Sequence, residues 1–304
     1  MGRHSLIFRA RALAAALIWT IVSPFMGSVS AGNLVVQEIR PSDADPPITR
    51  FNEPNYVVID DEATAAAQLV VFMPGTGGKP ANASQLLGVV AHLGYRVIGL
   101  EYNDEPAVVE VCPKSPIASC SGNFRRRRIF GGDVNSVVAN TESETIVTRL
   151  VKLLQYLDVH DAAGHWGDYL EGGEPNWPRI VVSGLSQGAG MAAYIAKQKP
   201  VARVVLFSSP WDFQRDSRRL APWLIEPGAT PPERWYAEYH RREKTAALIA
   251  QAYQALQIPP SHIRVFDLDL PSGFKVKGDN PYHSSTIKVA AYAPDWEFLF
   301  GRSP

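Results

Sequence analysis

One run of sequence restricts the fold more than any other. Residues 180–193 are Ile-Val-Val-Ser-Gly-Leu-Ser-Gln-Gly-Ala-Gly-Met-Ala-Ala. The first part is apolar and β-branched, which indicates a buried strand, and the last part is rich in small residues, which indicates a closely packed helix. Glycines two residues before and two after Ser186 permit a tight turn between them. The run therefore predicts a strand–turn–helix unit with an exposed serine hydroxyl at its apex.

Strands and helices alternate along the rest of the chain. Strands are expected at 34–39, 56–59, 68–73, 95–100, 179–183, 202–208, 234–239 and 263–270, and helices at 83–93, 141–159, 189–198 and 244–256. This alternation predicts an α/β fold, with a mostly parallel central sheet and helices on both faces. In such sheets the ligand-binding and catalytic residues lie at the carboxyl ends of the strands.

Two segments interrupt the alternation and are interpreted as loop insertions near 103–134 and 209–235. The first is expected to be irregular, because it contains Pro, Gly, both cysteines and four consecutive arginines. We interpret the arginines as a solvated or ion-paired surface rather than a phosphate site. The second contains Trp211, Trp223 and Trp235, which would either shape a pocket over the site or pack in the core.

The beginning of the chain has the features of an export signal. A basic start and an apolar stretch over 12–22 precede small residues that end at Ala31. This predicts a secretory signal peptide over 1–31, a single domain over 32–304, and a secreted or periplasmic location. The apolar stretch is short for a membrane span of about 20 residues, although an uncleaved anchor is the alternative.

The chain contains only two cysteines, which bear on the disulfide and metal sites it could form. The two cysteines, Cys112 and Cys120, predict a small disulfide loop if the chain is exported, with free thiols as the alternative. A zinc site there is not expected, since no histidine or further cysteine lies near them in the sequence.

Lys plus Arg and Asp plus Glu both number 30, so the formal net charge is zero. That balance gives no electrostatic reason to expect nucleic acid or an anionic membrane as partner.

The strand–turn–helix unit resembles the nucleophile elbow of the α/β-hydrolase superfamily, and of its lipases and esterases in particular. By that resemblance Ser186 is the nucleophile of a serine hydrolase. The helix that follows would aim its free amides at the charge that develops during attack. Many lipases carry histidine before the serine, whereas this chain has Leu185, which points to no particular lipase subfamily. A glycine-rich packing turn with a buried serine is the purely structural alternative.

A glycine-rich loop follows an early buried strand, at residues 74–79 (Pro-Gly-Thr-Gly-Gly-Lys). The resemblance implies that the backbone N–H groups of Thr76 and Gln187 bind the oxyanion. A phosphate-binding loop is the competing interpretation. It fails because Met73 stands where that motif requires glycine, and Pro80 stands where it requires serine or threonine.

In this superfamily the acid and then the histidine follow the nucleophile along the chain. Three histidines follow Ser186 in this sequence. His283 follows the last expected strand, in a polar loop where the superfamily keeps its base, and we predict it as that base. His262 begins a strand, at the wrong end of the sheet. His240 lies near the end of the preceding strand, ahead of one of the acid candidates.

The acid is open between two carboxylates that follow expected strands. Glu243 fits the usual position and is preferred, while Asp212 follows the strand before and is the alternative acid. Each also has a structural interpretation, since Glu243 could favour a helix N-terminus and Asp212 could cap a turn. Asp269 follows the last expected strand, which is too late in the order.

Together these residues predict cleavage of carboxylic esters, or related acyl bonds, through an acyl-enzyme. No metal or organic cofactor is expected. The expected partner is a small-molecule or lipid ester, with no nucleic acid and no stable membrane span after signal cleavage, and the oligomeric state is left open. An acyltransferase with the same residues, and an exported binding protein without turnover, are the alternatives.

Overall fold

A single sheet of eight strands organises the structure, which is a computed structural model describing residues 1–2, 33–214, 219–275 and 279–301. The strand order is β1-β2-β4-β3-β7-β8-β9-β10. The strands are β1 (Leu34–Ile39), β2 (Asn55–Asp60), β3 (Leu69–Met73), β4 (Arg96–Gly99), β7 (Ile180–Leu185), β8 (Arg203–Phe207), β9 (Trp235–His240) and β10 (Ile263–Phe266). Strand β2 is antiparallel to β1 and β4, and all pairings from β4 to β10 are parallel. The predicted α/β class and all eight expected strands are confirmed.

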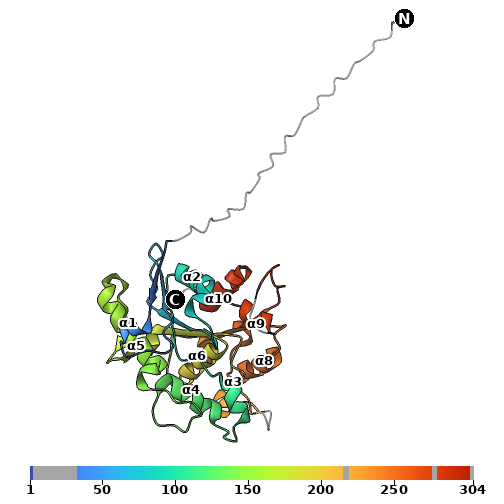
Figure 1. The fold of residues 1–304 in the computed structure, drawn as a ribbon. Helices are drawn as coiled ribbons and strands as arrows, with labels where there is room; N and C mark the ends of the chain where they lie inside the picture. The colour runs from blue at the N-terminus through green and yellow to red at the C-terminus, as the bar shows by residue number, and fades with distance from the viewer. Residues whose placement is uncertain (3–32, 215–218, 276–278, 302–304) are drawn as a thin grey trace. The chain divides into compact units, whose positions relative to one another are not determined.

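Helices cover both faces of this sheet (Figure 1). Helices α5, α6 and α8 lie on one face, with α4 packed against α5 and α6, and α2 and α10 lie on the other. The long helices are α2 (Ser84–His92), α4 (Cys120–Phe130), α5 (Ile146–His160), α6 (Gln187–Gln198), α8 (Ala246–Ala255) and α10 (Ala293–Phe300). The short ones are α1 (Pro41–Ala44), α3 (Val108–Val111), α7 (Pro222–Ile225) and α9 (Pro281–Ser285), and β5 (Leu170–Glu171) pairs with β6 (Glu174–Pro175) in a separate hairpin.

The buried sheet explains why strand prediction succeeds here. All five residues of β3 are at most 2% exposed, because helices shield both of its faces and each position is apolar. Helix α5 begins after Thr145, whose Oγ1 accepts a hydrogen bond from the Thr148 N–H at 3.1 Å. Thr141, where this helix was expected to begin, lies instead before a short turn that precedes it, and Thr141 N–H donates to the Glu144 carboxylate at 2.9 Å.

The expectation of an irregular segment over 103–134 is wrong, because the segment contains α3 and the three-turn helix α4. Two of the four arginines, Arg125 and Arg128, belong to the buried face of α4, together with Phe124 and Ile129. A buried helical face that contains two arginines lacks the apolar periodicity by which helices are predicted. The interpretation as ion-paired arginine holds for Arg125, which forms a buried salt bridge described below.

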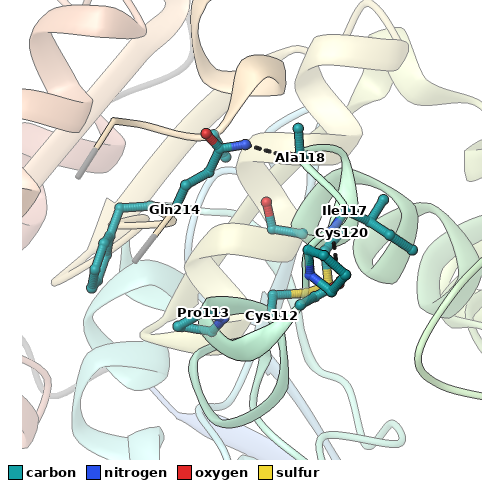
Figure 2. Close-up of a pocket in the computed structure, with 11 residues that line it drawn as sticks. Cys112, Pro113, Ile117, Ala118, Cys120 and Gln214 are labelled. Atoms are coloured by element: carbon teal, nitrogen blue, oxygen red, sulfur yellow. Dashed lines mark hydrogen bonds between the residues drawn. A yellow bond between two sulfur atoms is a disulfide. The ribbon is translucent and has the colours of Figure 1, made fainter. Parts of the chain in front are cut away.

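A disulfide joins Cys112 and Cys120, as predicted, and links the end of α3 to the start of α4. It lines a pocket of about 200 Å³ formed by the two insertions (Figure 2). Gln214 of the second insertion donates to the Ala118 carbonyl of the first at 3.2 Å. The two insertions therefore contact each other at the disulfide.

The described residues from 33 to 301 belong to one compact unit. The predicted signal peptide over 1–31 lies outside the described residues, apart from the first two. Within the described ranges, no helix has the length and apolar character that crossing a membrane requires.

Glu101, which follows β4, generates a prediction about stability. Burial, reinforced by the nearby Asp104 carboxylate, raises the pKa of Glu101 to about 8. The unfolded chain releases this proton near the ordinary glutamate pKa of about 4.3, so wild-type stability falls as pH rises between these values. The Glu101→Gln variant lacks that ionisation. We expect its thermal midpoint to exceed that of wild type at about pH 9 and to match it near pH 4.

The exposed Glu171 supplies the control, because Glu171→Gln should leave the pH dependence of the thermal midpoint unchanged. Parallel curves for Glu101→Gln and wild type across this range would contradict the raised pKa.

Candidate active site

Ser186 lies on a strained turn between β7 and α6. Its backbone has φ 54° and ψ −118°, a conformation that residues with a side chain rarely adopt. The flanking glycines make it possible, since a Cβ on Gly184 would lie 2.6 Å from the Met73 carbonyl oxygen and one on Gly188 would collide with the same atom. Ser186 N–H donates to the Phe207 carbonyl of β8 at 2.9 Å. The predicted strand–turn–helix unit is thus present, with the serine half-buried at its apex.

The loop after β3 forms a turn against this serine. Gly78 N–H donates to the Gly75 carbonyl at 2.8 Å, and Gly77 has φ +64°, which favours glycine at the third position of such a turn. A Cβ on Gly75 would lie only 3.1 Å from the Ser186 Cβ, so glycine permits this approach. Thr76 is the exposed residue between these glycines.

Gln187 is the first residue of α6, so its backbone N–H has no acceptor within the helix. Its buried side chain has a second role that was not expected from the sequence. Val108 N–H donates to Gln187 Oε1 at 2.8 Å, and Gln187 Nε2 donates to the Asp104 carbonyl at 2.6 Å. The glutamine therefore ties the start of the first insertion to the turn that carries Ser186.

His283 and Glu243 are in direct contact, with His283 Nδ1 2.7 Å from Glu243 Oε2. The Glu243 side chain is fully buried, while that of His283 remains 22% exposed. The other glutamate oxygen, Oε1, accepts from the His240 N–H at 2.8 Å and from the Ser208 hydroxyl at 2.6 Å. Three donors therefore surround a carboxylate that has lost contact with water.

The local settings of these two residues differ from expectation. Glu243 lies in a turn three residues before α8 instead of opening that helix. His283 lies in the short helix α9 and not in an irregular loop. Proline and asparagine just before it suggested a loop, yet proline is also favoured in the first turn of a helix, where its missing N–H costs nothing.

The remaining histidines are occupied by other contacts. His240 is fully buried, its Nε2 lies 3.0 Å from the Leu268 carbonyl, and its Nδ1 accepts from the Arg242 N–H at 3.1 Å. One nitrogen must then donate and the other accept, which makes the ring neutral, and burial lowers the pKa of His240. His262 lies before β10, with Nδ1 3.1 Å from the Trp235 carbonyl.

The other acid candidates are paired with arginine. Arg125 forms two bonds to Asp212, from Nε at 2.8 Å and from Nη2 at 2.5 Å, and both side chains are at most 2% exposed. Trp223 Nε1 also donates to Asp212, at 3.0 Å. Asp269 is exposed and contacts Arg242. Of the three predicted carboxylates, only Glu243 contacts a histidine among the described residues.

A cavity of about 600 Å³ is lined by three of the predicted site residues. Ser186, His283 and Thr76 all line it, as do Leu185 and Lys288. Its other walls come from the turn after β3 and from the segment around α9. Trp223 and Trp235 do not line it but are buried in the core, so for them the packing interpretation is the one that the structure supports.

The carboxyl group of Asp104 lies beside the turn that carries Thr76. Burial, followed by the neighbouring Glu105 carboxylate, raises the pKa of Asp104 to about 6, and the Gly77 and Gly78 N–H groups act in the opposite direction. No group of three or more His, Cys, Asp or Glu residues suited to a metal ion is found in the described parts of the chain.

No protein-family model and no curated protein matches the chain. Among solved structures it is similar to a bacterial heroin esterase, at 15% identity over 90% of this chain and 86% of that one, with a TM-score of 0.46. It is also similar to an S-formylglutathione hydrolase from Agrobacterium tumefaciens, at 13% identity over 89% and 96%, with a TM-score of 0.47. A third, an esterase of the bacterial hormone-sensitive lipase family, shares 16% identity over 88% and 84%, with a TM-score of 0.43.

The fold assignment rests on the sheet itself, which is mostly parallel with helices on both faces, and on the turn between β7 and α6. These are the features of the α/β-hydrolase fold that the sequence led us to expect.

The Arg125–Asp212 pair yields a prediction about stability. Removing one partner of a buried ion pair leaves an uncompensated charge, which costs about 3–5 kcal/mol. We therefore expect Asp212→Ala to lower the free energy of unfolding by that amount in denaturant titrations. The exposed pair Arg179–Asp168 is the control, since Asp168→Ala should cost less than about 1 kcal/mol. Equal losses for the two variants would contradict a structural role for Asp212.

Proposed function

We propose that the protein is a serine hydrolase that cleaves carboxylic esters through an acyl-enzyme. The observation that carries the proposal is the meeting of three elements at one cavity: the strained Ser186, the His283–Glu243 pair and the turn at Thr76. A packing turn alone would explain the glycines but not a histidine–carboxylate pair opening onto the same cavity.

In the proposed reaction, the Ser186 hydroxyl oxygen bonds to the ester carbonyl carbon while its proton passes to His283 Nε2. The carbonyl π electrons move to the oxygen, and the N–H groups of Thr76 and Gln187 stabilise the resulting oxyanion. The carbon–oxygen bond to the alcohol then breaks, and the alcohol leaves with the proton from His283. Water repeats these steps on the acyl-enzyme and releases the carboxylic acid.

Glu243 keeps the histidine in the required tautomer. Its carboxylate accepts from His283 Nδ1–H, which leaves Nε2 without a proton to act as the base, and it stabilises the imidazolium without taking its proton. The bonds from Ser208 and from the His240 N–H hold the carboxylate in this orientation.

The size of the cavity supports a small-molecule ester as substrate, because about 600 Å³ falls within the usual range of ligand pockets. We also propose that the chain is exported, with residues 1–31 as its signal peptide and 32–304 as one domain. The disulfide between Cys112 and Cys120 supports export, since such bonds persist in oxidising compartments.

The nucleophile is tested by labelling the protein with a fluorophosphonate probe and locating the modified residue by mass spectrometry. We expect the label on Ser186, because an activated serine beside an oxyanion hole reacts with this probe. Ser186→Ala should lose both labelling and hydrolysis of short-chain p-nitrophenyl esters. Folded wild-type protein that takes no label, or a Ser186→Ala variant that keeps its activity, would refute the proposal.

The acid is tested by Glu243→Gln. Neutralising the group that orients the histidine should lower kcat by at least about a hundredfold. Asp269→Asn is the matched control, because this carboxylate also follows a strand but is exposed and contacts Arg242; it should keep wild-type kcat. A Glu243→Gln variant as active as that control would remove Glu243 from the mechanism.

A further inference from the structure

The side chain of Gln187 is buried against the first insertion, although the proposed mechanism uses only the backbone N–H of this residue. Gln187 is 4% exposed. Its Oε1 accepts from the Val108 N–H at 2.8 Å, and its Nε2 donates to the carbonyls of Asp104 at 2.6 Å and Pro106 at 3.2 Å. Both ends of the amide are thus hydrogen-bonded, which holds the side chain in one orientation.

These contacts suit an amide in particular, because they require an acceptor and a donor from the same side chain. Val108 is the first residue of α3, so its N–H has no acceptor within that helix. The Asp104 carbonyl, in contrast, needs a donor. A buried N–H or carbonyl without a partner costs free energy. Both backbone groups would therefore lose a partner without the Gln187 amide.

The segment that Gln187 contacts is also held by α4. Arg128 of that helix is 1% exposed, and its guanidinium donates to the backbone carbonyls of Asn103, Glu105 and Pro106. Nη1 also donates to Asn103 Oδ1 at 3.0 Å. A guanidinium presents its donors in a rigid, planar fork, so the carbonyls bound to it keep fixed relative positions. Arg128 thus makes residues 103–106 a firm anchor for the glutamine.

Helix α4 contacts Gln187 directly as well. The Arg125 guanidinium occupies the space that a side chain on Gly190 would need, and its Nη1 donates to the Gln187 carbonyl at 3.4 Å. The disulfide between Cys112 and Cys120 joins the start of α4 to the end of α3. The two helices that contact Gln187 are therefore joined covalently.

We propose that the Gln187 side chain is a positioning residue, which fixes the oxyanion-binding N–H of the same residue by anchoring it to the first insertion. That N–H belongs to the peptide unit between Ser186, with its strained φ of 54°, and α6. Such a conformation persists only where the surroundings fix it, and an oxyanion donor is effective only when it is held in place in advance. The inference rests on the proposed function, in which this N–H binds the oxyanion.

Gln187→Met tests the positioning role. Methionine is unbranched and of similar size, but it cannot donate and accepts only weakly, while the backbone N–H remains. We expect kcat for a p-nitrophenyl ester, expressed per serine labelled by the fluorophosphonate, to fall at least about tenfold with KM nearly unchanged. Removing an oxyanion donor outright costs about a hundredfold or more, whereas here the donor is only displaced. Gln198→Met is the matched control, because Gln198 is exposed at the end of the same helix, and it should keep wild-type kcat.

Gln187→Glu is a second variant of nearly the same shape. It keeps an acceptor for the Val108 N–H but places an oxygen against the carbonyls of Asp104 and Pro106, so its kcat should fall as well. Wild-type kcat per labelled serine in either Gln187 variant would overturn the proposal.

The affinity for a transition-state analogue separates positioning from a loss of folded protein. A trifluoromethyl ketone forms a tetrahedral adduct with the serine, and the oxyanion of that adduct occupies the oxyanion hole. Its Ki should rise in Gln187→Met by about the factor by which kcat falls. A purely structural role would instead lower the thermal midpoint and the number of labelled sites, and leave Ki and kcat per site unchanged.

Hydrogen exchange at the Val108 N–H separates failure of this inference from failure of the proposed function, since it requires no turnover. The N–H should be protected in wild type and should exchange at least about tenfold faster in Gln187→Met, which lacks the amide oxygen that accepts from it. Equal exchange in the two proteins would overturn the anchor even if wild type hydrolyses esters. Folded wild type that takes no fluorophosphonate label would refute the proposed function, and the positioning role with it, whatever the exchange shows.

Discussion

The close contact between Met73 and Gly188 is the constraint on which the candidate site depends. Met73 ends β3, Gly188 lies in the first turn of α6, and any side chain at Gly188 would collide with the Met73 carbonyl. Only this approach brings the loop after β3 and the first amide of α6 to the same side of Ser186. The N-terminal amides of a helix have no partners within it and carry the positive end of its dipole. Main-chain packing thus places both the serine and the positive potential beside it.

The histidine half of the site is held by hydrogen bonds between segments that follow β9 and β10. Helix α9 has five residues, too few to be stable in isolation, so its position depends on its neighbours. Trp296 of α10 supplies one such contact, since its Nε1 donates to the Thr286 carbonyl at 2.8 Å and its side chain is fully buried. The C-terminal helix α10, which the sequence analysis did not anticipate, therefore supports the segment that carries His283.

How much could be predicted from sequence depended on where each side chain finds its partners. The strands and the turn at Ser186 were predictable, because a sheet covered on both faces requires apolar runs and a tight turn requires glycine. Helix α4 was not, because its buried face carries Arg125, whose partner Asp212 lies 87 residues away in the chain. The same pairing explains why sequence alone left the acid open between Asp212 and Glu243. Both residues follow strands, and only the fold shows that Arg125 pairs with Asp212.

Two buried carboxyl groups that follow neighbouring strands, Asp212 and Glu243, have different partners. Asp212 is neutralised by the fork of Arg125, which leaves its oxygens no freedom to act on a histidine. Glu243 instead accepts hydrogen bonds from the Ser208 hydroxyl and the His240 N–H, and its other oxygen contacts His283. Of these two carboxylates, only Glu243 contacts a histidine among the described residues, and the proposed function depends on that contact.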